Sequence, residues 1–236
     1  MIEMVAFDAD DTLWHNESIF TVTQEKFLAL MKPFVSSEGI EERLVATEIK
    51  NSKLFGYGIK AFMLSMIETA IELSEERVGA RQIQEIIDAG RAMLSHPVDL
   101  LPGAADAVAK VSETHKVMLI TKGDILDQES KLARSGLGDR FSAVEIVSEK
   151  RPATYERILT RLGIAPEKFL MVGNSLKSDV VPVLDIGGVG VHVPYHTTWA
   201  AERVEDEEAV RKRPRFHHID SLAELPVLLS RLDAAT

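Results

Sequence analysis

The stretch Met4-Val-Ala-Phe-Asp8-Ala-Asp10-Asp-Thr-Leu-Trp14 decides how the rest of the chain is interpreted. Its first four residues form a short apolar run, and three carboxylates follow directly after it. An apolar run of this kind, ended by small polar residues, predicts a buried strand that leads into a loop. Asp8 and Asp10 lie two positions apart, so an extended chain directs both side chains to the same side.

This acidic pair favours two kinds of chemistry. Like charges at short range repel, so the pair is costly at the mouth of a buried strand unless a cation lies between the carboxylates. Mg²⁺ is the simplest cation for an all-oxygen site, because it keeps few protein ligands and takes the rest from water and phosphate. An aspartate is also ionised at neutral pH, so Asp8 could attack phosphorus without a base. The alternatives are an acidic loop of the calcium-binding type and a solvated turn.

Composition sets further limits on function. The chain has 236 residues, 45% of them hydrophobic, which is enough for one domain with an insertion or for two small domains. No apolar run reaches the ~20 residues of a membrane span, and no signal segment precedes the first strand. The chain has no cysteine, and its net charge is −10. We therefore expect a cytoplasmic protein that binds neither membranes nor nucleic acid, and whose site reverses the negative charge locally. The oligomeric state is not predicted.

The chain divides into a core and an insertion. From residue 16 to residue 96 the apolar residues recur at helical spacing, with a glycine-punctuated connection at Lys53–Gly58 and no strand candidate. This pattern predicts an all-helical cap domain at residues 16–96, inserted into a core formed by residues 1–15 and 97–236.

Strands and helices alternate through the second part of the core. The predicted strands lie at residues 116–121, 143–147, 168–172, 188–193 and 216–219, and helical segments separate them. Such alternation predicts an α/β fold, namely a doubly wound parallel sheet with helices on both faces. Ligands of these sheets bind beyond the carboxyl ends of the strands.

Polar residues follow each of the next predicted strands. The second strand ends in Thr121, Lys122 and Gly123, where a hydroxyl and the N–H groups that lead into a helix suit a phosphate oxygen. Lys150 follows the third strand, and Asp179 lies in a turn after the fourth. Taken singly, each residue is more readily explained as a helix cap or an exposed side chain. Their succession at four strand ends indicates one site.

The combined pattern resembles the haloacid dehalogenase-like (HAD) hydrolase superfamily. Its four motifs are matched by Asp8-x-Asp10-x-Thr12, Thr121, Lys150 and Gly173-Asn174-Ser175-x₃-Asp179. The resemblance covers the whole core, which it implies is Rossmann-like, and the helical block lies where that family inserts a helical cap.

The resemblance also implies a role for each matching residue. Asp8 would be the nucleophile that forms an aspartyl-phosphate, and Asp10 would act as general acid and then as general base. Thr121 and the neighbouring backbone would bind the phosphoryl oxygens, and Lys150 would balance their charge. Mg²⁺ would be held by the Asp8 carboxylate, the main-chain carbonyl of Asp10 and Asp179. The implied activity is a Mg²⁺-dependent phosphatase that acts on a small phosphorylated metabolite.

Two departures from the family pattern leave questions open. Asn174 stands where the fourth motif often has Asp, so its part in metal binding is uncertain. The third motif reads Lys150-Arg151-Pro152 where Lys-Pro is commoner, so either Lys150 or Arg151 could face the phosphate; we choose Lys150.

Four other functions fit the same scaffold. A 2-haloacid dehalogenase usually lacks the second acid, which is present here as Asp10. A phosphonatase, which typically needs a cap lysine such as Lys50, Lys53 or Lys60, and a sugar-phosphate mutase both stay open. A catalytically silent binding module is disfavoured because the chain retains the motif residues Asp8, Asp10, Thr121, Lys150 and Asp179. The sequence does not identify the phosphate ester.

Overall fold

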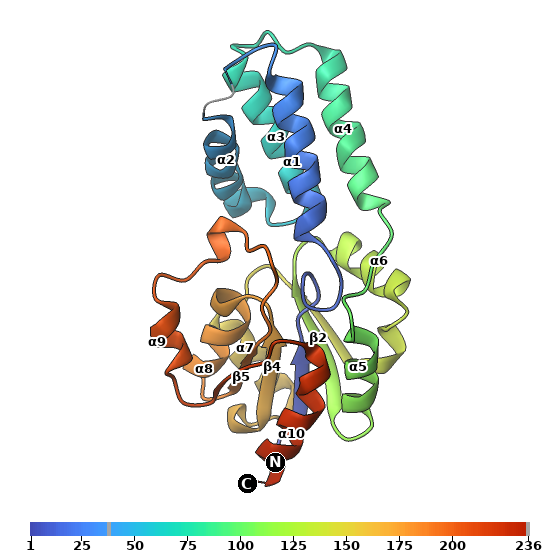
Figure 1. Ribbon diagram of the computed structural model, residues 1–236, viewed down its shortest axis with the longest axis vertical. Coiled ribbons are helices and arrows are strands. Elements are labelled where there is room, and N and C mark those ends of the chain that lie inside the picture. The colour runs from blue at the N-terminus through green and yellow to red at the C-terminus, as the bar shows by residue number, and fades with distance from the viewer. Residues whose placement is uncertain (37–38, 235–236) are drawn as a thin grey trace. The chain divides into compact units, whose positions relative to one another are not determined.

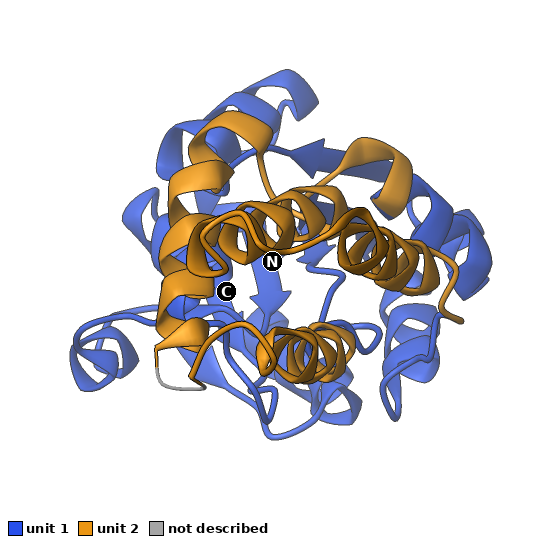
Figure 2. Ribbon diagram, turned by 90° about the horizontal axis from the view of Figure 1, so that it is seen from above, with its two compact units in different colours: residues 1–17, 98–122, 128–236 blue, residues 18–97, 123–127 orange. Residues whose placement is uncertain are grey.

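The computed structural model describes residues 1–36 and 39–234, which form two compact units (Figure 2). The first unit comprises residues 1–17, 98–122 and 128–236, and the second comprises residues 18–97 and 123–127. The short segment 123–127 therefore joins the helical unit, whereas the sequence-based division assigns it to the core. That the second unit works as a cap stays a prediction.

The first unit is built on a six-stranded parallel sheet (Figure 1). Its order is β3-β2-β1-β4-β5-β6, and the strands are β1 Met4–Phe7, β2 Lys116–Lys122, β3 Ala143–Val147, β4 Phe169–Gly173, β5 Val189–His192 and β6 Phe216–His218. Strand β1 pairs with β2 on one side and with β4 on the other, so the chain reverses its direction of winding there. The predicted doubly wound α/β fold is confirmed.

Helices cover both faces of this sheet because the strands are apolar on both sides. On one face, Val5 and Phe7 of β1 pack with α5 (Ala104–Ser112) and α10 (Leu225–Ala234). On the other face, Met4 and Ala6 pack with α7 (Pro152–Leu162) and α8 (Val181–Asp185). Neighbouring residues of one strand thus serve opposite layers of the core, as the two-residue period of a strand requires.

The second unit has its own core. It contains α1 (Glu17–Met31), α2 (Ile40–Phe55), α3 (Ile59–Leu73) and α4 (Ala80–Leu94), and α6 (Ile125–Ser135) begins in it. The buried side chains Phe27, Leu44, Phe62, Met66 and Ile86 bring the first four helices together. None of the helices in the described part of the chain is both long and apolar enough to span a membrane.

One local prediction differs from the structure. Residues 53–55 continue α2, which ends at Gly56 with φ 74°, because Lys, Leu and Phe extend a helix until a glycine permits the left-handed turn. A short helix, α9 (Glu207–Arg211), precedes β6. Asp206 caps α9 by accepting the N–H of Ala209 at 2.9 Å, a local bond that the apolar pattern does not register.

Candidate active site

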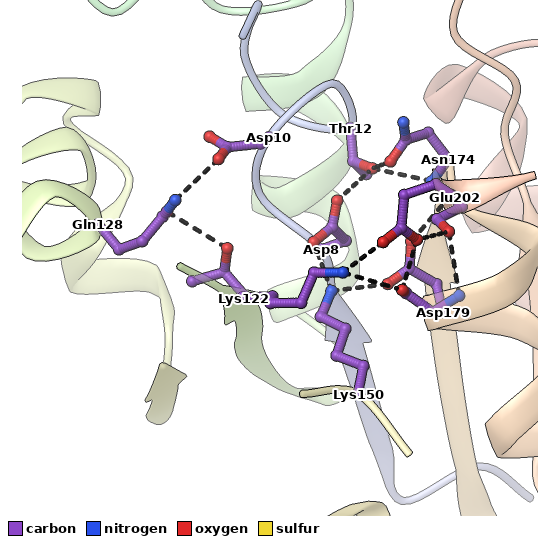
Figure 3. A network of polar contacts seen from close by, with 12 residues as sticks. Asp8, Asp10, Thr12, Lys122, Gln128, Lys150, Asn174, Asp179 and Glu202 are labelled. Atoms are coloured by element: carbon purple, nitrogen blue, oxygen red, sulfur yellow. Dashed lines mark hydrogen bonds and ion pairs between the residues drawn. The ribbon is translucent and has the colours of Figure 1, made fainter. Parts of the chain in front are cut away.

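Asp8, Lys150 and Asp179 meet at the carboxyl ends of β1, β3 and β4 (Figure 3). Asp8 directly follows β1, and its main-chain N–H donates to the carbonyl oxygen of Val172 in β4, 2.9 Å away. Nζ of Lys150 lies 2.5 Å from Oδ1 of Asp8 and 2.6 Å from Oδ1 of Asp179. The three side chains are buried, with exposed fractions of 9% for Asp8, 2% for Lys150 and 1% for Asp179. One ammonium thus bridges two buried carboxylates.

The charges of this triad depend on one another. Burial by itself lowers the pKa of Lys150, but the negative charges of Asp179 and Asp8 outweigh burial and raise that pKa above its usual range. Burial, followed by the charge of Asp8, raises the pKa of Asp179 to about 7 against the opposing effect of Lys150. Two carboxylates that one ammonium only partly compensates make a site that favours further positive charge.

Asp179 is held in place by the backbone around it. A π-helical turn, Leu176–Val180, carries the residue, and Oδ2 of Asp179 accepts the N–H of Ser175 at 3.0 Å. A Cβ at Gly173 would lie 2.2 Å from that Oδ2, so only glycine leaves room for the carboxylate. The buried hydroxyl of Tyr155 donates to a carbonyl of the turn at 3.0 Å. These contacts direct Asp179 toward the ends of the strands.

Thr12 connects Asp8 to the loop after β4. Its hydroxyl donates to Oδ2 of Asp8 at 2.9 Å and accepts the N–H of Asn174 at 3.0 Å. The side-chain Oδ1 of Asn174 lies 3.3 Å from the same hydroxyl. The amide oxygen of Asn174 therefore contacts the hydroxyl that orients Asp8.

Asp10 is directed elsewhere, toward Gln128 (Figure 3). Its carboxylate accepts hydrogen bonds from Trp14 Nε1 and Gln128 Nε2, each at 2.7 Å, and from Nζ of Lys131 at 3.1 and 3.3 Å. The hydroxyl of Thr121 donates to Oε1 of the same Gln128 at 3.2 Å. The two predicted residues Asp10 and Thr121 are thus linked through Gln128.

Lys122 and Gly123 have different surroundings. The ammonium of Lys122 forms an ion pair with Glu202 and lies 3.4 Å from the hydroxyl of Ser178. Burial raises the pKa of Glu202, but the charge of Lys122 and the hydroxyls of Ser175 and Ser178 outweigh it and lower that pKa to about 2. Gly123 has φ 147° and belongs to the second unit.

The geometry distinguishes Lys150 from Arg151. Arg151 stands at the N-cap of α7 with 72% of its side chain exposed, and its guanidinium lies 3.9 Å from Glu149. The ammonium of Lys150 contacts Asp8. Lys150 is therefore the cation at the strand ends.

The oxygens at the strand ends suit a hard cation. Among the described residues, no three His, Cys, Asp or Glu side chains are grouped to hold a metal ion. The set that the motifs imply needs only two carboxylates, those of Asp8 and Asp179, because its third oxygen is the main-chain carbonyl of Asp10. Both carboxylates already converge on one cation, Nζ of Lys150. All-oxygen ligands and a surplus of negative charge are what Mg²⁺ requires, so the donor set fits that ion.

The sequence analysis did not single out three side chains that contact the predicted site residues. Gln128 and Lys131 lie one helical turn apart in α6, a spacing that places both on one face and could have marked them as a pair. Glu202 ends a short 3₁₀ helix, Ala200–Glu202, and no periodic or motif signal marks it.

Comparison with known proteins agrees with this fold. A model of haloacid dehalogenase-like hydrolases matches residues 2–182, so the chain belongs to that hydrolase family, as its motifs predict. The crystal structure of a haloacid dehalogenase-like family hydrolase from Xanthomonas campestris is 43% identical, with a TM-score of 0.88 over 99% of this chain and 93% of that one.

Two curated relatives are phosphatases. The human N-acylneuraminate-9-phosphatase is 27% identical over 139 residues, which cover 55% of this chain and 53% of the relative. The glyceraldehyde 3-phosphate phosphatase of Pyrococcus furiosus is 29% identical over 93 residues, which cover 37% of this chain and 39% of the relative. The matches thus span about half or less of the length of these relatives.

Proposed function

We propose that this hydrolase is a Mg²⁺-dependent phosphatase that hydrolyses a small phosphorylated metabolite through an aspartyl-phosphate. The observation that carries the proposal is the convergence of Asp8, Lys150 and Asp179 on one buried point at the ends of three strands. The phosphatase names of the two curated relatives support the reaction class.

In the first step, a carboxylate oxygen of Asp8 attacks phosphorus and the ester P–O bond breaks. The leaving oxygen takes a proton from Asp10. Lys150 balances the negative charge shared by Asp8 and the phosphoryl group, and Thr121–Gly123 bind phosphoryl oxygens. Fixed positive charge at these oxygens is the main requirement of phosphoryl transfer.

In the second step, water attacks the phosphorus of the aspartyl-phosphate and gives a proton to Asp10. Inorganic phosphate leaves, and the carboxylate of Asp8 is restored. Asp8, Asp179 and the main-chain carbonyl of Asp10 would hold Mg²⁺, which would supply positive charge to the phosphoryl oxygens. Asp10 serves both steps, so its carboxyl group must be able to reach the reacting oxygen.

We further propose that the helical unit closes over the substrate. Its main segment, residues 18–97, is inserted between the strand that precedes Asp8 and the strand that ends near Thr121. Segment 123–127 of the same unit directly follows Lys122. Closure would exclude bulk water and strengthen the charge interactions at the site. A cytoplasmic location stays a prediction.

The test is turnover of a panel of phosphate esters, including p-nitrophenyl phosphate and sugar phosphates, with Mg²⁺ and with EDTA. We expect release of phosphate that needs Mg²⁺ and falls roughly 10³-fold or more in Asp8→Asn. The matched control is Asp106→Asn, because Asp106 is an exposed carboxylate on α5. Acid-quenched wild-type protein should carry one added phosphoryl group, and Asp8→Asn should not.

Two results would overturn the proposal. Halide release from a 2-haloacid without Mg²⁺, in the absence of ester turnover, indicates a dehalogenase. Neither activity, with a folded protein that still binds phosphate, indicates a binding module.

A further inference from the structure

The carboxylate of Asp10 has no free acceptor site in this structure. An ionised carboxylate has about four lone-pair positions on its two oxygens. Oδ1 accepts from Trp14 Nε1 at 2.7 Å and from Lys131 at 3.1 Å, and Oδ2 accepts from Gln128 at 2.7 Å and from Lys131 at 3.3 Å. These four contacts leave no position for the proton that a general acid carries. Asp10 is therefore in a resting orientation, and at least one donor must release it before it can act.

Gln128 is the donor that also contacts the proposed phosphate site. Its Nε2 donates to Asp10, and its Oε1 accepts from the hydroxyl of Thr121 at 3.2 Å. The opposite orientation of the amide would turn Oε1 toward a carboxylate, so the charge of Asp10 determines which way the amide points. Gln128 and Thr121 are both buried, with exposed fractions of 3% and 1%. Both groups are therefore largely shielded from water.

The hydroxyl of Thr121 has a single proton to donate. If the hydroxyl donates its hydrogen bond to a phosphoryl oxygen, it no longer donates to Oε1 of Gln128. The amide then loses one of the two hydrogen bonds that fix it. The ammonium of Lys131 also donates to Oδ1 of Asn16 at 2.8 Å. With three donors on a flexible stem, it can keep that bond and still follow the carboxylate of Asp10. The contacts that must break are those that Gln128 and Trp14 make with Asp10, and the indole N–H of Trp14 can be observed directly.

We propose that Gln128 is a positioning residue that couples phosphate binding at Thr121 to the release of Asp10 from its resting orientation. This inference rests on the proposed function. Asp10 is held away from the reacting atoms until the phosphoryl group is bound, because the hydroxyl of Thr121 donates to Gln128 first and to the substrate afterwards.

The indole N–H signal of Trp14 in a ¹H–¹⁵N NMR spectrum tests the proposal. A hydrogen bond to a carboxylate moves an indole proton downfield, so release of Asp10 moves it upfield. We expect an upfield shift of Trp14 when Mg²⁺ and orthophosphate are added to the wild-type protein. Trp199, the second tryptophan of the chain, is the internal reference. Trp199→Phe assigns the two signals.

Two variants test the coupling without any ligand. Thr121→Val removes the donated proton, and Gln128→Met removes the amide at similar length. In both we expect the Trp14 signal at the upfield position that phosphate produces in the wild type. Gln84→Met is the matched control, because Gln84 is exposed on α4; it should leave the signal unchanged.

A Trp14 signal that stays downfield in folded Gln128→Met and Thr121→Val overturns the coupling. The same conclusion follows if wild-type protein binds orthophosphate, as its backbone amide shifts would report, while Trp14 does not move. Failure of the proposed function is a separate outcome, namely no ester turnover. If no ester is turned over, the Trp14 signal of the unliganded variants still tests the coupling. If a variant does not fold, the phosphate titration of the wild-type protein tests it.

Discussion

Replacing Lys150 with methionine should destabilise the protein strongly, because the change leaves two buried carboxylates without their shared cation. Nζ lies 2.5 Å from Asp8 and 2.6 Å from Asp179. At an effective dielectric constant of ~20, each attraction amounts to about 6 kcal/mol. Removing the three ions from water costs several kcal/mol for each ion, and this cost offsets most of the attraction. The intact triad therefore adds little net stability. Breaking such a group by removing one member costs roughly 3–5 kcal/mol.

The assay is urea unfolding followed by circular dichroism at neutral pH with EDTA. We expect Lys150→Met to lose that amount of unfolding free energy. Lys110→Met, at an exposed position on α5, should stay within about 0.5 kcal/mol of the wild type. Mg²⁺ should stabilise Lys150→Met more than the wild type, because the ion supplies the missing positive charge.

A double variant decides whether uncompensated charge is the cause. Asp179→Asn in the Lys150→Met background removes one of the two facing charges and keeps an oxygen that can accept the N–H of Ser175. The double variant should therefore be more stable than Lys150→Met alone. If it is equally or less stable, or if Lys150→Met costs less than about 1 kcal/mol, the electrostatic account of the triad is wrong.

Three further changes have defined outcomes. Gly173→Ala places a Cβ 2.2 Å from Oδ2 of Asp179, so we expect a loss of about 1–3 kcal/mol in urea unfolding; an unchanged midpoint would contradict the close approach. The pKa of Glu202 is lowered to about 2, so its stabilisation is present above pH ~4.5 and is lost as the pH falls toward 2. Glu202→Gln should therefore cost roughly 3 kcal/mol at pH 6 and clearly less at pH 3, and an equal cost at both pH values would refute the charge assignment. Tyr155→Phe leaves the carbonyl of Ser178 without its donor at 3.0 Å, and we expect a cost of about 1–3 kcal/mol in urea unfolding; a variant as stable as the wild type would show that this bond does not hold the turn.

Much of the fold follows from short segments of sequence. Met4–Phe7 is apolar at every position because β1 is buried on both faces, and the acids that follow mark its end. Alternating strands and helices then require parallel strands, and the carboxyl ends of parallel strands share one edge of the sheet. Asp8, Lys150 and Asp179 could therefore be expected to meet, although Asp8 and Lys150 lie 142 positions apart.

The direction of each side chain at that edge was not predictable in the same way. Asp10 shares the strand end of Asp8, yet its carboxylate is directed to Gln128 and Lys131 in α6. Glu202 forms its ion pair with Lys122 from a short 3₁₀ helix, Ala200–Glu202, which is too short to show a periodic pattern. Local patterns record burial and backbone conformation, whereas these orientations depend on donors supplied by distant segments.

The amino-acid sequence by itself determined that the chain forms a parallel sheet, which polar residues follow the successive strands, and the family to which the chain belongs. Hydrophobic period and motif spacing are local properties, so they can be read from the sequence. The tertiary structure alone decided that Lys150 bridges Asp8 to Asp179 and which residues bind the carboxylate of Asp10. It also decided that Glu202 forms an ion pair with Lys122. Those pairings are made by side chains that become neighbours only when the separate strands and helices pack together.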